Sequence, residues 1–316
     1  MPRISVLVTY HNEGEKLTRC LRSIVQQQPP IAEILVHDDA SSLRPEPYLP
    51  DDPRIRVLRS EPNVGPAAGR NRLLAASSGD YVHWHDADDW LEMGWAQAMQ
   101  AQLHASPELI YCEVRAVDER GVEVAGRVLD VPAFKSETQP LAYALRNSLL
   151  VPSSLIARSL LQRVGGYRED LRQSEDYEFN LRLLCAEPRL VLVDTPLVTL
   201  EWRHDNRSRV EVGRVYQDAF AILGEFVAAQ PAYRPLAAEA IAGFVVRLLD
   251  QGEQRVAREG IGLARVWGPP AYRHFGRAYR LLARWLGQMG AWRVTRGYQR
   301  LLPRQLRAWL RLGARR

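Results

Sequence analysis

Short apolar runs alternate with polar turns and amphipathic segments over the first ninety residues. Residues 4–9, 31–37, 55–58 and 81–85 are largely β-branched or apolar and have the length of buried strands. After the first run, apolar residues follow the helical spacing of one buried stripe, at Leu17, Cys20, Leu21, Ile24 and Val25. This order predicts an α/β fold with a mostly parallel sheet flanked by helices, whose ligand cleft lies at the carboxyl ends of the strands.

Two turns carry signals for the start of a helix. Asn12, with Glu15 three residues later, resembles a capping box in which Asn12 caps the first helix. Asn63-Val64-Gly65 precedes Pro66, a residue suited to the first turn of the second helix.

Acidic residues directly follow two of the predicted strands. Asp38 and Asp39 end the second run, and Asp86, Asp88 and Asp89 end the fourth. In an extended chain Asp86 and Asp88 share a face while Asp89 points away. A divalent cation relieves the repulsion between two such carboxylates and fills its other positions with phosphate oxygens, so the spacing predicts a metal-bound diphosphate. The alternative is a solvated turn in which Asp89 caps a following helix.

The common phosphate-binding loops are missing from the sequence. No Gly-x-Gly-x-x-Gly follows the first predicted strand, and no Gly-x-x-x-x-Gly-Lys occurs. The usual backbone cradles of dinucleotide-binding proteins and of P-loop proteins are therefore excluded. Carboxylates and a metal would have to hold the phosphates instead.

Composition is that of an ordinary globular protein with one large domain and a smaller one. The chain has 316 residues, 46% of them hydrophobic and 25% charged, and no run approaches the length of a membrane span. Its three cysteines are odd in number and lack paired spacing, which predicts neither a disulfide framework nor a zinc site. A cytoplasmic location without a signal segment is the expectation.

The carboxyl-terminal part is strongly basic. No acidic residue follows Glu259, while thirteen arginines lie between Arg265 and Arg316. At helical spacing, one side carries Phe275, Tyr279, Leu282, Leu286 and Met289, and the opposite side Arg273, Arg277, Arg280 and Arg284. Residues 304–311 repeat the pattern. We expect a helical extension over 206–316, with a basic amphipathic tail over 261–316 that either binds an anionic membrane surface or packs within the protein.

Several motifs occur in an order typical of one enzyme family. They are Thr9-Tyr10-His11-Asn12-Glu13-Gly14, Asp38-Asp39-Ala40-Ser41, Asn63-Val64-Gly65 with Arg70-Asn71, Gly79-Asp80-Tyr81, Asp86-Ala87-Asp88-Asp89, Val164-Gly165-Gly166-Tyr167 and Ser174-Glu175-Asp176-Tyr177. This set resembles the inverting nucleotide-sugar glycosyltransferases of family 2, which have the GT-A fold. The resemblance implies a catalytic domain over 1–205, with donor binding in 1–90 and the acceptor side in 91–205.

The resemblance also implies the residues that hold the donor. Asp39 would bind the nucleotide base, helped by Thr9 and Tyr10, and Arg70 would lie near the ribose or the phosphates. Asp86 would approach the ribose and a metal-bound water. Asp88 would ligate Mn²⁺ or Mg²⁺, with His204 near the diphosphate as a second ligand. A UDP-sugar is the favoured donor.

On the acceptor side, Asp176 would be the catalytic base. Apolar residues at Tyr177, Leu181 and Leu184 predict a helix that Ser174 caps, which places Asp176 in the first turn, where an anion is favoured. The resemblance implies that Glu175 helps to hold the acceptor, and Trp90 could be a stacking wall for a sugar, although an aromatic residue that opens a helix more often belongs to the core. A glycan or lipid-linked acceptor, in the synthesis of bacterial cell-surface polysaccharide or lipopolysaccharide, is expected.

Three other readings remain open from the sequence. A nucleotidyltransferase of related fold would have a Gly-rich basic loop after the first strand, and a non-catalytic nucleotide-sugar-binding module would have lost its base or its metal ligands. A nucleic-acid-binding protein would use the basic tail, but no recognition motif accompanies it, so no nucleic-acid partner is predicted. His37 and His85 continue the alternation of their strands, which favours packing over metal binding.

Overall fold

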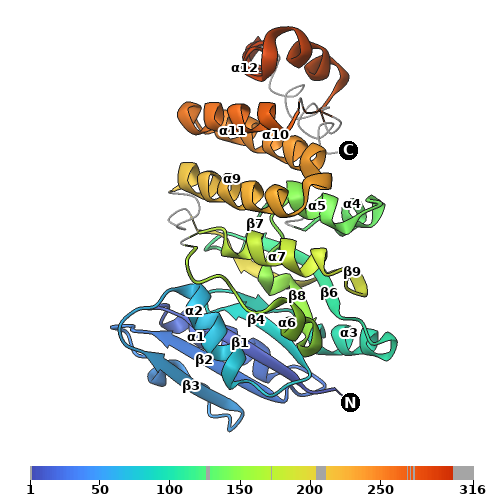
Figure 1. Cartoon of the computed structure of the whole chain (residues 1–316). Helices are drawn as coiled ribbons and strands as arrows, with labels where there is room; N and C mark the ends of the chain where they lie inside the picture. Colours follow the sequence, from blue (N-terminus) through green and yellow to red (C-terminus); the bar gives the residue numbers. More distant parts are fainter. Residues whose placement is uncertain are drawn as a thin grey trace. The chain divides into compact units, whose positions relative to one another are not determined.

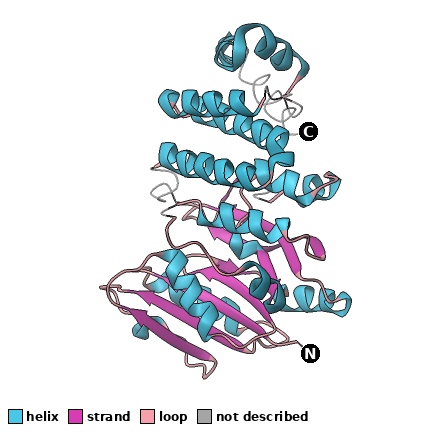
Figure 2. Ribbon diagram, in the orientation of Figure 1, coloured by secondary structure: helices cyan, strands magenta, loops and turns pink. Residues whose placement is uncertain are grey.

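The computed structural model describes residues 2–125, 129–171, 173–203, 211–268, 270, 272 and 275–301. The chain forms two compact units, Met1–Val210 and Glu211–Arg316. Strands and helices alternate in the first unit, and every described element of the second is helical (Figures 1 and 2). The predicted boundary after residue 205 lies close to this division.

The first unit is built on a single sheet of nine described strands. The sheet runs in the order β3-β2-β1-β4-β8-β6-β9-β5, and β7 pairs with β6. The strands are β1 (Ile4–Tyr10), β2 (Glu33–Asp39), β3 (Ile55–Ser60), β4 (Tyr81–Asp86), β5 (Trp90–Leu91), β6 (Leu109–Val117), β7 (Glu123–Ala125), β8 (Ser154–Ala157) and β9 (Leu190–Glu201).

The first four strands are parallel and correspond to the four predicted runs. In their register Thr9 of β1 lies opposite His37 of β2 and Asp86 of β4, and Asp38 lies opposite Tyr10. The polar ends of β1, β2 and β4 therefore meet at one edge, as the strand order predicted.

The other half of the sheet is mixed. Strand β8 is antiparallel to both β4 and β6, while β6 and β9 are parallel to each other. The α/β prediction is confirmed, although the parallel arrangement of the first half does not extend across the whole sheet.

Helices cover this sheet and carry several site residues. They are α1 (Glu15–Val25), α2 (Pro66–Ala76), α3 (Trp95–Gln102), α4 (Val131–Ser136), α5 (Pro140–Arg146), α6 (Arg158–Val164) and α7 (Glu175–Cys185), with the short 3-10 helices η1 (Glu46–Tyr48), η2 (Leu103–Ala105) and η3 (Val151–Ser153). The predicted stripe of α1 is buried at Leu17, Cys20, Leu21 and Ile24, which join the core that includes Val6, Val8 and Trp95.

A glycine brings α2 close to the sheet. A Cβ at Gly69 would lie 2.6 Å from His37 Nδ1, so a larger residue there would push α2 away from β2. His37 is 1% exposed, and its Nε2 lies 2.7 Å from Ser60 Oγ. This histidine is therefore part of the packing, as the strand alternation predicted.

The predicted capping box of the first helix is wrong. Helix α1 begins at Glu15 after Gly14, and no side chain caps it. Asn12 has a positive φ of 59°, and its Oδ1 accepts a hydrogen bond from Leu43 N at 2.9 Å. Asn12 therefore ties the loop after β1 to the loop after β2.

The described part of the second unit is helical, as expected for residues 206–316. Its helices are α9 (Val212–Ala229), η4 (Pro231–Tyr233), α10 (Arg234–Asp250), α11 (Gln254–Trp267) and α12 (Arg277–Leu301). Residue 261, the predicted start of the basic tail, falls inside α11, where Gly260 and Ala264 are buried. Among the described residues, no helix is both long and apolar enough to cross a membrane.

Together with Phe275 just before it, helix α12 packs through most of the predicted apolar side, including Tyr279 and Leu282. It bends at Gly287, where φ is 68°. Tyr279 and Ala283 are buried, as the pattern requires for one side of the helix, but Leu286 next to the bend is 54% exposed. The predicted repeat at 304–311 lies outside the described residues.

Candidate active site

The carboxyl edge of β1, β2 and β4 gathers acidic side chains. Asp86 ends β4, and its Oδ1 accepts a hydrogen bond from Thr9 Oγ1 at 2.8 Å. Its side chain is 35% exposed, so Asp86 is open to a ligand at this edge. Thr9 and Asp86, both predicted donor-binding residues, are therefore brought together.

Asp39 organises the neighbouring loop. Its Oδ1 accepts a hydrogen bond from Val64 N at 2.7 Å, and its Oδ2 accepts one from Gly65 N at 2.9 Å. Gly65 has a φ of 84°, a conformation that favours glycine. A carboxylate offers about four lone-pair positions, so Asp39 keeps capacity for a further donor while it holds the start of α2.

Tyr10 requires a correction. Its side chain is 1% exposed, and its hydroxyl donates to the Leu43 carbonyl at 2.6 Å. Successive side chains of a strand point to opposite faces, so the strand that presents Thr9 to Asp86 turns Tyr10 into the core. The predicted donor contact through the Tyr10 side chain is not supported.

The chain turns after β4 and separates its last two acids. Asp89 N donates to Asp86 O at 3.1 Å, which closes the turn, and Asp89 is 5% exposed. Asp89 Oδ1 accepts a hydrogen bond from Glu201 N at 3.0 Å. It therefore points away from the cleft, as expected, but it holds β9 and does not cap a helix.

Asp88 lies in a region of negative charge that Arg203 only partly offsets. Burial, together with the charges of Asp86 and Glu13, raises the pKa of Asp88 to about 7. Arg203 Nη1 lies 3.8 Å from Asp88 Oδ2 and forms a long ion pair with it. The charge of Arg203 lowers the pKa of Asp88 but only partly offsets the effect of burial and of the neighbouring acids.

This arrangement fits a divalent cation shared with a ligand. No group of three or more His, Cys, Asp or Glu side chains suited to a metal occurs in the described part of the chain. Mg²⁺ and similar ions often use one or two carboxylates and take their other oxygens from phosphates, so Asp88 could hold such an ion only together with a diphosphate. His204, the second predicted ligand, lies outside the described residues.

Arg70 is the centre of the site. It is 5% exposed, and its guanidinium lies 3.2 Å from Asp86 Oδ1, 2.9 Å from Glu175 Oε1 and 3.4 Å from Asp176 Oδ1. Burial alone would lower the pKa of Arg70, but the charges of Asp176 and Asp86 raise it well above its usual value. Arg70 thus joins the predicted donor side to the predicted acceptor side.

A clamp between α2 and the loop before α7 holds this arginine. The side-chain amide of Asn71 donates to Tyr167 O at 2.9 Å and accepts from Tyr167 N at 2.7 Å. A Cβ at Gly166 would lie 2.3 Å from Asn71 Oδ1, so this contact requires glycine. The Tyr167 ring then lies 5.2 Å from the Arg70 guanidinium.

Asp176 lies in the first turn of α7, as predicted. The helix is anchored by Tyr177, whose hydroxyl donates to Leu145 O at 2.8 Å, and by Asn180, whose side chain donates to Leu149 O at 2.9 Å. Ser174 occupies the cap position, but its side chain makes no cap hydrogen bond to the helix. The predicted Ser174 cap is therefore correct in position and wrong in mechanism.

The ionisation of Asp176 differs from the expectation. Its side chain is 26% exposed, whereas its Oδ1 is buried without a hydrogen-bond partner among the described residues. Burial raises the pKa of Asp176 to about 7, and the charge of Arg70 only partly opposes this shift. The effect of burial on the pKa of Asp176 outweighs the favourable position of an anion at the start of the helix. Asp176 can therefore both release and accept a proton near neutral pH.

Trp90 does not open a helix. It forms the short strand β5 with Leu91, opposite Thr199 of β9. The Arg19 guanidinium lies 4.2 Å from the centre of the Trp90 ring and so covers one face. The half-buried indole is therefore partly occupied, and its contact with a sugar stays a prediction.

The two histidines of β4 belong to the interior. His83 Nε2 and His85 Nδ1 lie 3.1 Å apart, and neither residue is more than 1% exposed. Burial lowers the pKa of His83 to about 3 and that of His85 to about 4, so both are neutral. The packing interpretation of His85 is confirmed.

Glu13 and Arg203 are site residues that the sequence analysis missed. Glu13 Oε2 lies 3.0 Å from Arg203 Nη1, and both border Asp88. Glu13 belongs to the motif that follows the first strand, and Arg203 follows β9, but 190 residues separate the two and no local pattern relates them.

The fold and this edge together define an α/β domain of the GT-A type. Residues 5–157 match the model of Glycosyl transferase family 2. An uncharacterized glycosyltransferase of Methanocaldococcus jannaschii is 26% identical over 230 residues, which cover 68% of this chain and 77% of that protein. The O-antigen biosynthesis protein RfbC of Myxococcus xanthus is 30% identical over 206 residues, 62% of this chain and 16% of that protein.

A solved structure has the same fold. The crystal structure of S. aureus TarS 1-349 in complex with UDP-GlcNAc matches with a TM-score of 0.64 and 20% identity, over 94% of this chain and 92% of that chain. The predicted GT-A fold is thereby confirmed, and the match of residues 5–157 agrees with the predicted family.

Proposed function

We propose that the protein transfers a sugar from a nucleotide-diphosphate donor to a hydroxyl group of an acceptor, with inversion at the anomeric carbon. The observation that carries this proposal is the convergence of Asp86, Arg70 and Asp176 at one edge of the sheet. Asp86, which suits the donor, and Asp176, whose pKa is raised to about 7, both contact the Arg70 guanidinium.

The donor would lie along the carboxyl ends of β1, β2 and β4. Asp39 would accept a hydrogen bond from the base while it fixes residues 64 and 65, and Asp86 would accept one from the ribose. We favour a UDP-sugar, and the UDP-GlcNAc in the related TarS structure supports this choice.

Asp176 would serve as the base. Its ionised carboxylate would take the proton of the acceptor hydroxyl while the acceptor oxygen attacks the anomeric carbon. The bond from that carbon to the diphosphate oxygen breaks, and the diphosphate leaves with the bonding electrons. One displacement from the opposite face inverts the configuration.

Asp88 would hold Mn²⁺ or Mg²⁺ together with the diphosphate. The cation would offset the charge that develops on the leaving group, an effect worth several kcal/mol. The raised pKa of Asp88 supports this role, because the negative charges of Asp86 and Glu13 that raise it would also favour a bound cation.

The acceptor is proposed by class only. Relatives such as RfbC, an O-antigen biosynthesis protein, support a role in the synthesis of cell-surface polysaccharide. A lipid-linked acceptor and a cytoplasmic location stay predictions.

Titration of UDP with and without Mn²⁺ tests the donor site. We expect Mn²⁺ to tighten UDP binding by at least about tenfold in the parent protein and to have no such effect in Asp88→Asn, which cannot provide an anionic ligand. Asp51→Asn, at an exposed loop position, is the matched control and should behave like the parent. Metal-stimulated binding that survives in Asp88→Asn would remove Asp88 from the site.

A further inference from the structure

Within the described residues, helix α12 packs against its unit through one side. Its Tyr279, Ala283 and Ala291 form a buried cluster against Val246 and Tyr272. Beyond the bend, Gln288 Nε2 donates to Ala242 O at 2.6 Å, and Trp292 Nε1 donates to Asp250 Oδ1 at 2.8 Å. These contacts fix which side of α12 faces α10.

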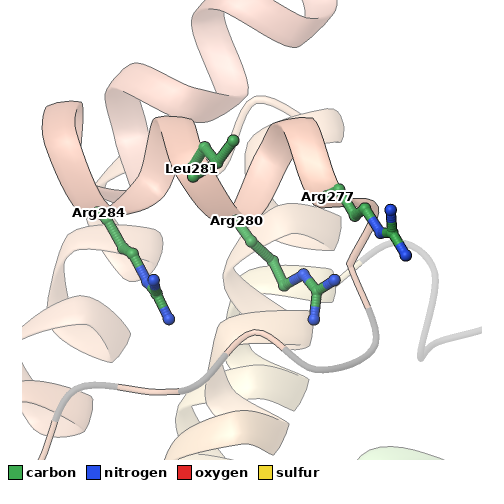
Figure 3. Close-up of a pocket in the computed structure, with 4 residues that line it drawn as sticks. All are labelled: Arg277, Arg280, Leu281 and Arg284. Carbon is green, nitrogen blue, oxygen red and sulfur yellow. The ribbon is translucent and has the colours of Figure 1, made fainter.

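The other side combines positive charge with large apolar side chains. Arg277, Arg280, Leu281, Arg284 and Trp285 are spaced three and four residues apart and share one face, which we call the α12 outer face. Leu281 is 57% exposed and Trp285 is 85% exposed. Figure 3 shows the three arginine side chains extending from one side of the helix, with Leu281 on the adjoining side.

The arginines of the α12 outer face have no carboxylate partners. None of the three forms an ion pair within the described residues, whereas Arg296 on the same helix pairs with Asp250. With Leu281 they line a pocket of about 250 Å³. Residues 211–316 contain eighteen arginines and seven carboxylates, so the local charge offers little compensation.

We propose that the α12 outer face binds the surface of an anionic membrane. The three guanidinium groups would contact lipid phosphates, and Leu281 and Trp285 would enter the boundary between headgroups and acyl chains. Tryptophan and leucine exposed among arginines suit this interface, since the aromatic ring and the aliphatic chain leave water while the charges remain at phosphate level. Three guanidinium groups beside an exposed indole and an exposed leucine on one helix match the boundary between anionic phosphates and acyl chains.

The side of α12 that would contact lipid is opposite to the side expected from the sequence. The stripe with Phe275, Tyr279 and Leu282 would be the natural apolar side of a lipid-binding helix, but the structure uses it to pack the second unit. The lipid contact falls instead to the arginine side, through Leu281 and Trp285. It does not depend on the proposed sugar transfer, because binding to vesicles is measured without donor or acceptor.

Co-sedimentation of the full chain with phosphatidylglycerol vesicles tests the charge. We expect binding that weakens with salt and is absent from phosphatidylcholine vesicles. The triple variant Arg277→Gln/Arg280→Gln/Arg284→Gln should bind about a hundredfold more weakly, since each basic residue at an anionic leaflet contributes about a fivefold factor. The control Arg234→Gln/Arg255→Gln/Arg258→Gln removes the same charge from exposed positions of α10 and α11 and should bind like the parent.

Quenching of tryptophan fluorescence by brominated phosphatidylglycerol tests the apolar contact. In the parent protein the fluorescence of Trp285 should be quenched. The Trp285→Phe variant should still bind the vesicles but should lose this part of the quenching. Any of three results would overturn the proposal: no vesicle binding by the parent, equal losses in the two triple variants, or binding without quenching of Trp285. A concentration-dependent dimer that the α12 triple variant abolishes would identify a second copy as the occupant and would equally reject the membrane.

Discussion

Arginine has opposite surroundings in the two units of this protein. Arg70 is buried and meets three carboxylates, those of Asp86, Glu175 and Asp176. The arginines of the α12 outer face form no ion pair within the described residues, and Arg277 and Arg284 are exposed. The same side chain therefore organises a site in one unit and offers charge to solvent in the other.

The distribution of acids explains this difference. In the first unit the sheet brings acidic strand ends together, and a buried guanidinium is stable there only because carboxylates surround it. In the second unit no acid follows Glu259, so the arginines of α12 have few partners. The role of an arginine in this protein therefore depends on whether carboxylates surround it, and the sequence alone does not show which carboxylates those are.

The largest expected effect concerns Asp176, the proposed base beside Arg70. Asp176→Asn keeps the shape of the side chain but cannot accept a proton, so kcat should fall by about a hundred- to ten-thousandfold. UDP affinity should change little, since the variant keeps the donor residues. Steady-state kinetics with a UDP-sugar and a competent acceptor, beside UDP titration, measure both. A variant that turns over like the parent would assign the base to another residue.

The second prediction removes one arginine from each environment. Arg70→Met leaves the three carboxyl groups without their shared counter-charge and should lower the free energy of unfolding of the first unit by about 2–4 kcal/mol. This predicted loss of stability is smaller than for a fully buried ion pair, because the side chains of Asp86 and Asp176 are 35% and 26% exposed and water screens their charges. The matched variant Arg284→Met should change the stability of the second unit by less than about 0.5 kcal/mol.

Hydrogen exchange in urea, read from peptides of each unit separately, measures both changes. Separate readings are required because two compact units need not unfold together. Similar losses in the two variants would contradict the contrast between the buried and the exposed arginine.

Local patterns in the sequence predicted the local parts of the site. The alternation of residues 81–85 placed Asp86 at the end of a buried strand, and apolar spacing placed Asp176 in the first turn of a helix. The alternation of side chains along β1 also predicts that Tyr10 is buried when Thr9 faces the site, because neighbouring side chains of a strand point to opposite faces. The family resemblance had implied instead that both residues contact the donor.

Contacts between distant residues could not be predicted in this way. Arg70 and Glu175 are 105 positions apart, and no periodicity relates them. The antiparallel pairing of β8 with β4 and β6 depends on the same kind of contact. For α12, the pattern located an apolar and a basic side correctly, but only packing against α10 decides which side remains exposed.

The smallest expected effect is a pH dependence that sharpens the role of Asp176. Burial raises its pKa to about 7, so below that pH the carboxyl group holds a proton and cannot act as a base. The value of kcat/KM should therefore fall about tenfold for each pH unit below 7 and level off above about pH 8. Asp88 also titrates near 7, but its protonation would weaken metal-dependent UDP binding. UDP titrations over the same pH range separate the two groups. If Asp176 causes the pH dependence, the rate still falls at low pH when UDP-sugar is saturating. If Asp88 causes it, the rate falls in parallel with the affinity for UDP. A rate that stays constant from about pH 5.5 to 8 would exclude an essential base with the raised pKa of Asp176.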